Sequence, residues 1–179
     1  MVVAIKVIDK KNMGEEDLAD IMNEVEMLQK MDHPNIVGYY ETYDDARYLY
    51  LIMENCPNGE LFDSIEKFTH QGRAYTEKDA AEVIRTCLQA LQHCHSQNIV
   101  HRDIKPENIM FGTDGKVRLV DFGLAKQTYR RMSTLAGTPY FMAPEVLDQN
   151  YTSKCDIWSL GCILYMIVCG CLPFEGKSR

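Results

Sequence analysis

The sequence lacks the residue spacing of a zinc site and of a disulfide framework. Its seven cysteines are an odd number, and they include no Cys-x-x-Cys pair and no partner histidines at zinc-finger spacing. We therefore expect reduced thiols in a cytoplasmic protein. Cys169-Gly170-Cys171 also allows a redox or metal pair, but a buried structural pair at the end of a helix is the favoured interpretation.

A surplus of positive charge is also missing. Lys and Arg number 19 against 26 Asp and Glu, which gives a net charge of -7 and opposes nucleic-acid or anionic-membrane binding as the main role. The N-terminus has neither the basic region nor the cleavage site of a signal peptide. The uncharged run 157–174 is long enough to suggest a membrane span, but Gly161 and Gly170 interrupt it and Pro173 ends it, which favours a buried core helix.

Internal repeats and low-complexity segments are absent, and 179 residues suit one domain. Residues 2–8 are rich in β-branched side chains and predict a buried strand from which Lys6 projects. From Glu15 onward, apolar residues recur at the spacing of an amphipathic helix of about five turns. They are Leu18, Ile21, Met22, Val25 and Leu28. Two apolar segments, 36–43 and 47–53, then flank Asp44-Asp45 as a hairpin.

The rest of the chain predicts mostly helix. After a linker at 57–59, helical spacing returns in a second apolar series. Its members are Ala80, Val83, Ile84, Cys87, Leu88 and Leu91. Asp114-Gly115 predicts a tight turn between short strands at 109–111 and 117–120. We therefore expect an α+β chain of two lobes, joined by a hinge-like loop near residues 54–59.

Four short motifs follow one another along the chain. They are Val3-Ala4-Ile5-Lys6, then His101-Arg102-Asp103-Ile104-Lys105-Pro106-Glu107-Asn108, then Asp121-Phe122-Gly123, and last Ala143-Pro144-Glu145. Asp121-Phe122-Gly123 is weak alone, but chance matches in a generic α+β domain seldom bring all four motifs together in this order. On these residues the chain resembles the eukaryotic protein kinases over nearly all of its length.

This resemblance implies a two-lobe kinase fold with a phosphoryl-transfer site in the cleft. Lys6 would contact the α- and β-phosphates of ATP, and Glu24 would be its ion-pair partner, with Glu26 on the same helix as the alternative. Asp103 would be the base or hydroxyl-orienting carboxylate, and Lys105 the cation beside the transferred phosphoryl group.

The same resemblance implies that Asn108 and Asp121 bind Mg²⁺. In the inter-lobe hinge, Met53 would be the gatekeeper, and the backbone of Glu54 and Cys56 would face the adenine. Ala4 and Met110 would sandwich the base, although a plain core role explains such apolar residues nearly as well. One further set would stack across both lobes on an anchor at Asp156, namely Leu28, Tyr39, His101 and Phe122.

The substrate class follows from the same comparison of motifs. Lys105, two residues after Asp103, and the run Gly137-Thr138-Pro139-Tyr140 are similar to serine/threonine kinases. Glu60 and Glu107 occupy positions at the cleft where basophilic relatives bind an arginine three residues before the phosphoacceptor, although they could be plain solvated carboxylates.

By the same resemblance, residues 121–145 form the activation segment, and this segment itself carries arginine at the same offset, in Arg130-Arg131-Met132-Ser133. We therefore expect autophosphorylation at Ser133, with Thr134 as the second site and Arg102 as a partner for the phosphate.

Within the kinases, the chain most resembles the calcium-dependent protein kinases, and the calmodulin-dependent group fits almost as well. The segments that carry this likeness are 23–28, 32–37, 58–63 and 151–161. Calcium or calmodulin would act through segments that are not in this sequence, because no EF-hand loop occurs in it.

Two pieces of the family pattern are missing from the sequence. No glycine-rich loop precedes Lys6, and the chain stops at 175–179, before the arginine that would pair with Glu145. We therefore expect a kinase domain truncated at both ends, with residues 1–54 in the small lobe, 55–59 as hinge and 60–179 in the large lobe. The sheet of the small lobe would have an exposed edge. If the chain were a complete protein, a catalytically poor kinase-like scaffold would be the alternative.

Overall fold

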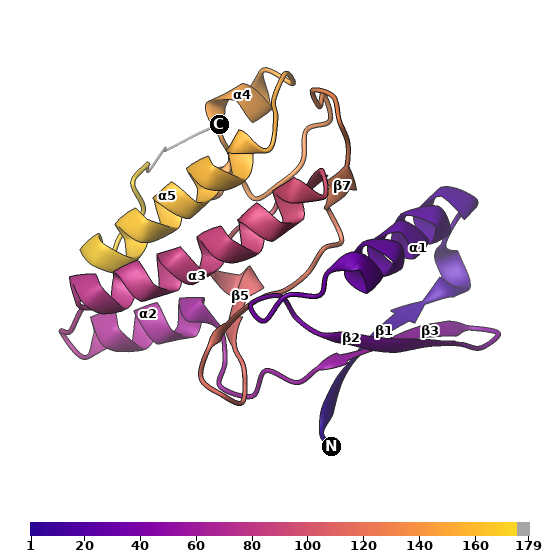
Figure 1. Cartoon of the computed structure of the whole chain (residues 1–179), viewed down its shortest axis with the longest axis horizontal. Coiled ribbons are helices and arrows are strands. Elements are labelled where there is room, and N and C mark those ends of the chain that lie inside the picture. Colours follow the sequence, from indigo (N-terminus) through magenta and orange to yellow (C-terminus); the bar gives the residue numbers. More distant parts are fainter. Residues whose placement is uncertain (175–179) are drawn as a thin grey trace.

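The computed structural model describes residues 1–174, apart from the side chain of Asn12. The end of the chain at 175–179, on which the expected loss of a partner for Glu145 rests, lies outside the described residues. A small lobe made of a sheet and one helix lies beside a larger, mainly helical lobe (Figure 1). This arrangement confirms the predicted α+β, two-lobe fold.

The small lobe is a three-stranded antiparallel sheet in the order β1-β3-β2. Its strands are β1 (Val3–Asp9), β2 (Tyr39–Asp44) and β3 (Tyr48–Glu54). The prediction of a buried first strand is wrong, since Ile5 and Val7 are 54% and 55% exposed. They lie on the face of an edge strand that no described element covers.

A 3-10 helix, η1 (Lys10–Asn12), leads from β1 to α1 (Glu15–Lys30). The backbone amide of Gly14 donates to Asp17 Oδ2 at 2.9 Å, so the first turn of α1 is capped from within. Val25 and Leu28 are buried as their spacing predicts, but Met22 is exposed. Met22 misses the core because the buried stripe is narrower than the apolar pattern indicates.

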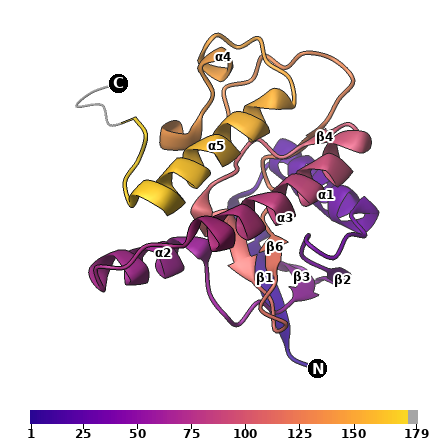
Figure 2. The ribbon, with the colours of Figure 1, turned by 60° about the vertical axis from the view of Figure 1, so that its left-hand side comes forward.

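The large lobe contains three long helices, α2 (Leu61–His70), α3 (Glu77–Ser96) and α5 (Lys154–Cys169). Between them lie the short elements β4 (Ile99–Val100), η2 (Pro106–Asn108), β5 (Ile109–Phe111), β6 (Val117–Leu119), β7 (Lys126–Gln127), η3 (Pro139–Phe141) and α4 (Pro144–Leu147). In the turned view, α3 and α5 again lie side by side (Figure 2). Sequence reasoning missed α2, although its buried residues Leu61 and Ile65 stand four apart, as on one face of a helix.

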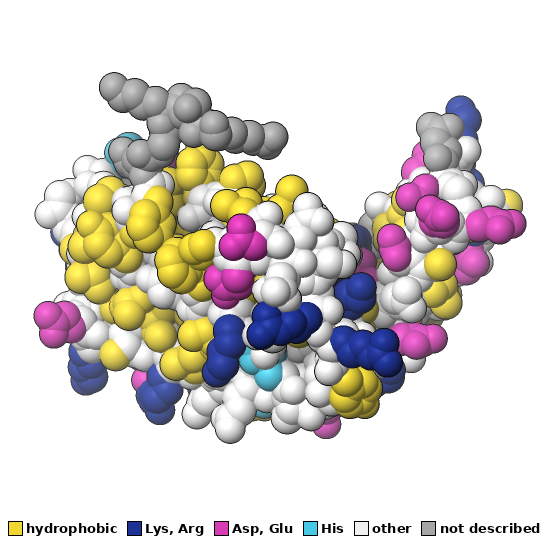
Figure 3. All heavy atoms as spheres, turned by 90° about the horizontal axis from the view of Figure 1, so that it is seen from above, with side chains coloured by type: hydrophobic (Ala, Val, Ile, Leu, Met, Phe, Trp, Pro, Cys, Tyr) yellow, Lys and Arg dark blue, Asp and Glu magenta, His cyan; other side chains and the backbone are white. Residues whose placement is uncertain are grey.

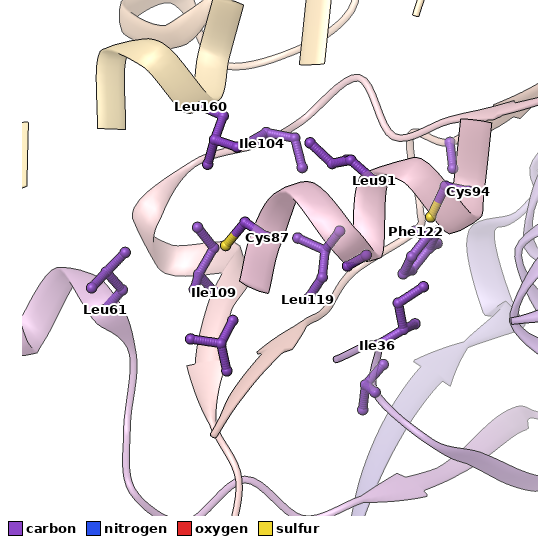
Figure 4. Close-up of a cluster of buried hydrophobic side chains, with 14 of the residues drawn as sticks. Ile36, Leu61, Cys87, Leu91, Cys94, Ile104, Ile109, Leu119, Phe122 and Leu160 are labelled. Atoms are coloured by element: carbon purple, nitrogen blue, oxygen red, sulfur yellow. The ribbon is translucent and has the colours of Figure 1, made fainter. Parts of the chain in front are cut away.

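One hydrophobic cluster continues from the small lobe into the large lobe. Figure 4 shows Ile36, from the segment before β2, beside Phe122 and Leu119, with Leu91 and Cys87 of α3 next to them. The strands β5 and β6 form the predicted hairpin, in which Gly115 has the positive φ of 72° that a tight turn requires. This shared core fixes the floor of the cleft between the lobes.

The uncharged run near the C-terminus forms α5, which ends where Gly170 adopts a φ of 71° and donates to Met166 O. The prediction of a buried core helix is only partly right, because Ile163 and Ile167 are buried while Trp158 and Tyr165 are exposed. Among residues 1–174, no helix combines the length and apolar character needed to cross a bilayer.

The seven cysteines are free and form no disulfide. Burial raises the pKa of Cys87 and Cys94 to about 12, so both stay protonated at neutral pH. The prediction for Cys169 and Cys171 is wrong in one respect, because both are exposed rather than buried. Cys169 is the last residue of α5 and Cys171 follows its C-cap, where the chain leaves the helix at the surface.

Candidate active site

An ion pair joins the sheet and the helix of the small lobe. Lys6 Nζ of β1 lies 2.7 Å from Glu24 Oε1 of α1 and 3.5 Å from Asp121 Oδ1 of the large lobe. Burial alone lowers the pKa of Lys6, but the hydrogen bond and charge of Glu24, with help from Asp121, outweigh it and raise the pKa. Glu24 is buried and Glu26 is exposed, so the structure pairs Lys6 with Glu24.

Lys6 lines a cleft between the lobes. The space-filling view shows the molecule hollowed between the two lobes (Figure 3). The cleft has a volume of about 910 Å³, including space continuous with solvent. Its lining includes most of the residues expected at a nucleotide. They are Ala4, Lys6, Glu24, Met53, Glu54, Cys56, Met110 and Asp121. Leu28, which was predicted to stack across the lobes, also lines the cleft. Four further lining residues had no predicted site role, namely Ile5, Val37, Asn55 and Val120.

The loop 101–108, the predicted catalytic loop, is fixed by one buried carboxylate of α5. Asp156 is 1% exposed and accepts hydrogen bonds from the backbone amides of His101, at 3.0 Å, and Arg102, at 2.8 Å. Arg102 has a φ of 68°, a left-handed conformation that is costly for a non-glycine residue. Asp156 holds the strained turn in place, and His95 adds a third contact at 2.8 Å that sequence reasoning missed.

His101 is fully buried and lies against Phe122, with ring centroids 4.8 Å apart. Its Nε2 is 3.1 Å from Val120 O and its Nδ1 accepts from the amide of Asp103, so the ring is neutral with the proton on Nε2. Burial is the main cause that lowers the pKa of His101. The packed rings of His101 and Phe122 place Asp121, the residue next to Phe122, at the cleft.

Asp103 stands at the centre of a polar cluster. It is held by Lys105 Nζ at 2.8 Å and by the hydroxyl of Thr138, which donates to Oδ1 at 2.7 Å. The side-chain amide of Asn108 donates through Nδ2 to Asp103 Oδ2 at 3.1 Å and to the backbone carbonyl of Asp103 at 2.9 Å. Burial raises the pKa of Asp103, but Lys105 and Thr138 outweigh it and lower the pKa. Asp103 is therefore an ionised carboxylate near neutral pH.

Thr138 is a member of the site that sequence reasoning did not assign. It belongs to the activation segment, and its hydroxyl also accepts from Lys105 Nζ at 3.3 Å. Its neighbour Gly137 runs so close to the catalytic loop that an added Cβ would lie 2.6 Å from Arg102 O. The only sequence signal was the position of Thr138 in the Gly137-Thr138-Pro139-Tyr140 run.

Asn108 and Asp121 offer oxygen atoms suited to a magnesium ion. Because Nδ2 of Asn108 is engaged by Asp103, the amide oxygen is the atom that remains for a ligand. Asp121 uses Oδ1 for Lys6 and for the amide of Gly123 at 3.3 Å, and its side chain is 48% exposed. Hard oxygen donors and few protein ligands fit Mg²⁺ that also binds phosphate oxygens.

Two buried side-chain atoms near the site have no hydrogen-bond partner within residues 1–174. They are Arg102 Nη1 and Glu107 Oε2. Arg102 uses Nε to donate to Leu124 O at 2.6 Å, so part of its guanidinium is engaged. Glu60 is half-buried at the N-cap of α2 and pairs with Met110 through an isolated β-bridge. The two atoms without a partner in residues 1–174, Arg102 Nη1 and Glu107 Oε2, are candidates for contacts with ligands.

The activation segment between the cleft and α4 is held by Tyr151. Met132 and Tyr151 exchange backbone hydrogen bonds of 2.9 and 3.1 Å, and the hydroxyl of Tyr151 donates to Thr134 O at 2.7 Å. Ser133 and Thr134 are both exposed. Their side chains are therefore accessible at the surface.

Comparison with known proteins agrees with this geometry. The family profile described as protein kinase domain matches residues 1–179. Calcium/calmodulin-dependent protein kinase type 1 of Macrobrachium nipponense is 47% identical over 183 residues, which cover 99% of this chain and 51% of that protein. Calcium-dependent protein kinase 5 of Plasmodium berghei is 41% identical over 181 residues, covering 98% of this chain and 31% of that protein.

A plant relative shows the same likeness. Calcium-dependent protein kinase 14 of Arabidopsis thaliana is 43% identical over 179 residues, covering 97% of this chain and 33% of that protein. The chain belongs to the protein kinase family, and it is similar to kinases named as calcium-dependent or calcium/calmodulin-dependent. It spans between about a third and a half of the length of these relatives.

Proposed function

We propose that this chain carries the catalytic centre of a serine/threonine kinase that transfers the γ-phosphoryl group of ATP to protein hydroxyls. The observation that carries the proposal is the cluster around Asp103, in which an ionised carboxylate lies 2.8 Å from Lys105 Nζ. Phosphoryl transfer needs positioning and charge neutralisation rather than a covalent nucleophile. The cluster supplies a cation and a carboxylate, and Asn108 and Asp121 supply two oxygen ligands for those needs.

Each residue then has a defined task. Lys6, held by Glu24, neutralises charge on the α- and β-phosphates, and Asp103 accepts the proton of the attacking hydroxyl or orients that hydroxyl. Lys105 stabilises the negative charge that spreads over the transferred group. Asn108 and Asp121 would hold Mg²⁺, which neutralises charge on the phosphate oxygens when bound. The backbone of Glu54 and Cys56 would hold the adenine between Ala4 and Met110.

We also propose a preference for substrates with arginine three residues before the phosphoacceptor. Glu107 supports this, because its Oε2 is buried without a partner among the described residues. An unpaired buried carboxylate oxygen is costly, and an arginine side chain would satisfy it with a charge-assisted hydrogen bond. Glu60 is the second candidate for this contact.

Autophosphorylation of the activation segment follows from the same preference. Ser133 stands three residues after Arg130 and is exposed, and Thr134 is the second candidate. The unpartnered Nη1 of Arg102 supports a role in binding the resulting phosphate. Control by calcium or calmodulin, and a cytoplasmic location with reduced thiols, complete the proposal.

The test is transfer of radiolabelled phosphate from Mg-ATP to a peptide containing Arg-x-x-Ser, with a matched Ala-x-x-Ser peptide. We expect phosphoserine in the first peptide and much less in the second. Asp103→Asn should abolish both signals, and phosphate that still appears on Ser133 in that variant would rule out self-catalysis. A folded chain that binds nucleotide without transfer would favour a scaffold instead.

A further inference from the structure

A second ion pair crosses from the small lobe to the large lobe beside the cleft. Arg118 Nε of β6 lies 3.0 Å from both carboxylate oxygens of Glu54, the last residue of β3. The side chains are only 11% and 20% exposed, so the pair is largely shielded from water. Such a pair is costly to break, because either partner alone would remain as a poorly solvated charge.

Glu54 is held from the small-lobe side as well. Its amide donates to Gly38 O at 2.7 Å, and the amide of Gly38 donates to Glu54 Oε2 at 3.2 Å. The segment before Gly38 is itself joined to β6, since Val37 donates to Leu119 O at 3.0 Å. The Glu54 carboxylate therefore contacts Gly38 of the segment before β2 and Arg118 of β6, which is its only cationic partner within residues 1–174.

The position of Arg118 relates this pair to the cleft. In the β5–β6 hairpin Arg118 is directly opposite Met110, and side chains of paired residues lie on the same face of a ribbon. Met110 and Glu54 both line the cleft, whereas Arg118 does not. Arg118 thus lies next to the lining of the cleft and contacts it through Glu54.

We propose that Arg118 is a positioning residue for nucleotide binding. Its guanidinium fixes the Glu54 side chain and so sets the orientation of the backbone from Glu54 to Cys56, which would hydrogen-bond the adenine. The inference rests on the proposed function, because an adenine nucleotide is the ligand that this backbone would hold. A segment already held in its binding conformation loses less entropy when the ligand binds, and therefore binds more tightly.

The test uses the whole chain with three changes. Arg118→Gln removes the cation, and the double variant Glu54→Gln with Arg118→Gln removes both charges, so that no unpaired buried carboxylate remains to unfold the protein. Asp114→Asn is the matched control. Asp114 lies in the β5–β6 turn, its Oδ2 is 3.3 Å from Arg118 Nη2, and it does not line the cleft. Circular dichroism melting checks that each variant is folded.

Two readouts distinguish positioning from a structural role. One is the Kd of N-methylanthraniloyl-ADP by fluorescence titration, and the other is amide hydrogen exchange at 54–56 without nucleotide. We expect the Kd to rise about ten-fold and the amide protection to fall in Arg118→Gln and in the double variant. Asp114→Asn should match the wild type, and kcat at saturating ATP should change much less than KM.

An unchanged Kd in the folded double variant would overturn the inference, as would an equal loss in Asp114→Asn. A fall in kcat with no change in KM or Kd would also overturn it. If the wild-type chain itself failed to bind the nucleotide, the proposed function would fail, and the role of Arg118 with it. Nucleotide binding and phosphate transfer that do not depend on Arg118 would reject this inference alone.

Discussion

Gly137 approaches Arg102 so closely that a Cβ at Gly137 would stand 2.6 Å from the Arg102 carbonyl oxygen. Gly137 also has a φ of 116°, which side chains rarely allow. The activation segment and the catalytic loop therefore touch through backbone at this point. The contact brings the next residue, Thr138, within 2.7 Å of Asp103 Oδ1.

Replacing Gly137 should thus separate the two loops. We expect Gly137→Ala to lower the free energy of unfolding by about 1 to 3 kcal/mol and to reduce kcat strongly, because Thr138 moves away from Asp103. Chemical denaturation and peptide phosphorylation measure the two effects. Gly72→Ala is the control, since Gly72 also has a positive φ of 64° but no neighbour within 4 Å. Similar activity losses in both variants would refute this explanation.

The Lys6–Glu24 pair makes a prediction about charge. We expect Lys6→Met to reduce kcat roughly 10²- to 10³-fold, the loss typical when one transition-state donor is removed. Glu24→Gln should produce a smaller loss in the same direction, because Lys6 stays charged but is less well held. Glu26→Gln on the exposed face of the same helix should leave the rate unchanged. Steady-state assays at saturating ATP measure kcat for the three variants. A loss of kcat in Glu26→Gln equal to that in Glu24→Gln would contradict the prediction.

Asp103 should matter for chemistry and not for nucleotide binding. Asp103→Asn keeps the shape of the side chain but removes the acceptor for the hydroxyl proton, so kcat should fall about 10²- to 10⁴-fold. The Kd of an ATP analogue should stay within a factor of about two, because Asp103 is not among the residues that line the cleft. Asp148→Asn, an exposed change on the surface, serves as control. Weakened nucleotide binding in Asp103→Asn would argue against this separation of roles.

His101 predicts how stability depends on pH. Its folded-state pKa lies below the ordinary value because burial disfavours the charged ring, so the unfolded chain binds the proton first as pH falls. Stability should therefore be full above about pH 6.5 and should decrease on acidification, by at most about 1.4 kcal/mol per pH unit from this residue. Urea unfolding between pH 5 and 8 measures it.

A variant without this titration should show a flatter profile. In His101→Phe the decrease below pH 6.5 should be smaller, although the pKa of His33 is also lowered by burial and leaves part of the effect. His70→Gln is the control, because the side chain of His70 is 77% exposed. A profile of His101→Phe that parallels the wild type would show that His101 is not the group responsible.

Local patterns sufficed for much of the fold. The spacing in α1 and α3 and the Asp114-Gly115 turn predicted elements that the structure contains, because helical period and turn chemistry depend on neighbours in sequence. Exposure was less predictable. Met22 fits the same apolar pattern as Val25, but only the packing of α1 on the rest of the molecule decides which of them is buried.

The order of amino acids alone specified which candidate groups are present: a lysine in a strand, an aspartate in the predicted catalytic loop, and an asparagine and a second aspartate after it. Their distances were decided by the tertiary structure, because Lys6 and Asp121 are 115 positions apart and meet only when the lobes pack together. Thr138 joined Asp103, and Arg118 joined Glu54, for the same reason. Contacts between residues far apart in sequence follow from the packing of whole elements, which no local pattern specifies.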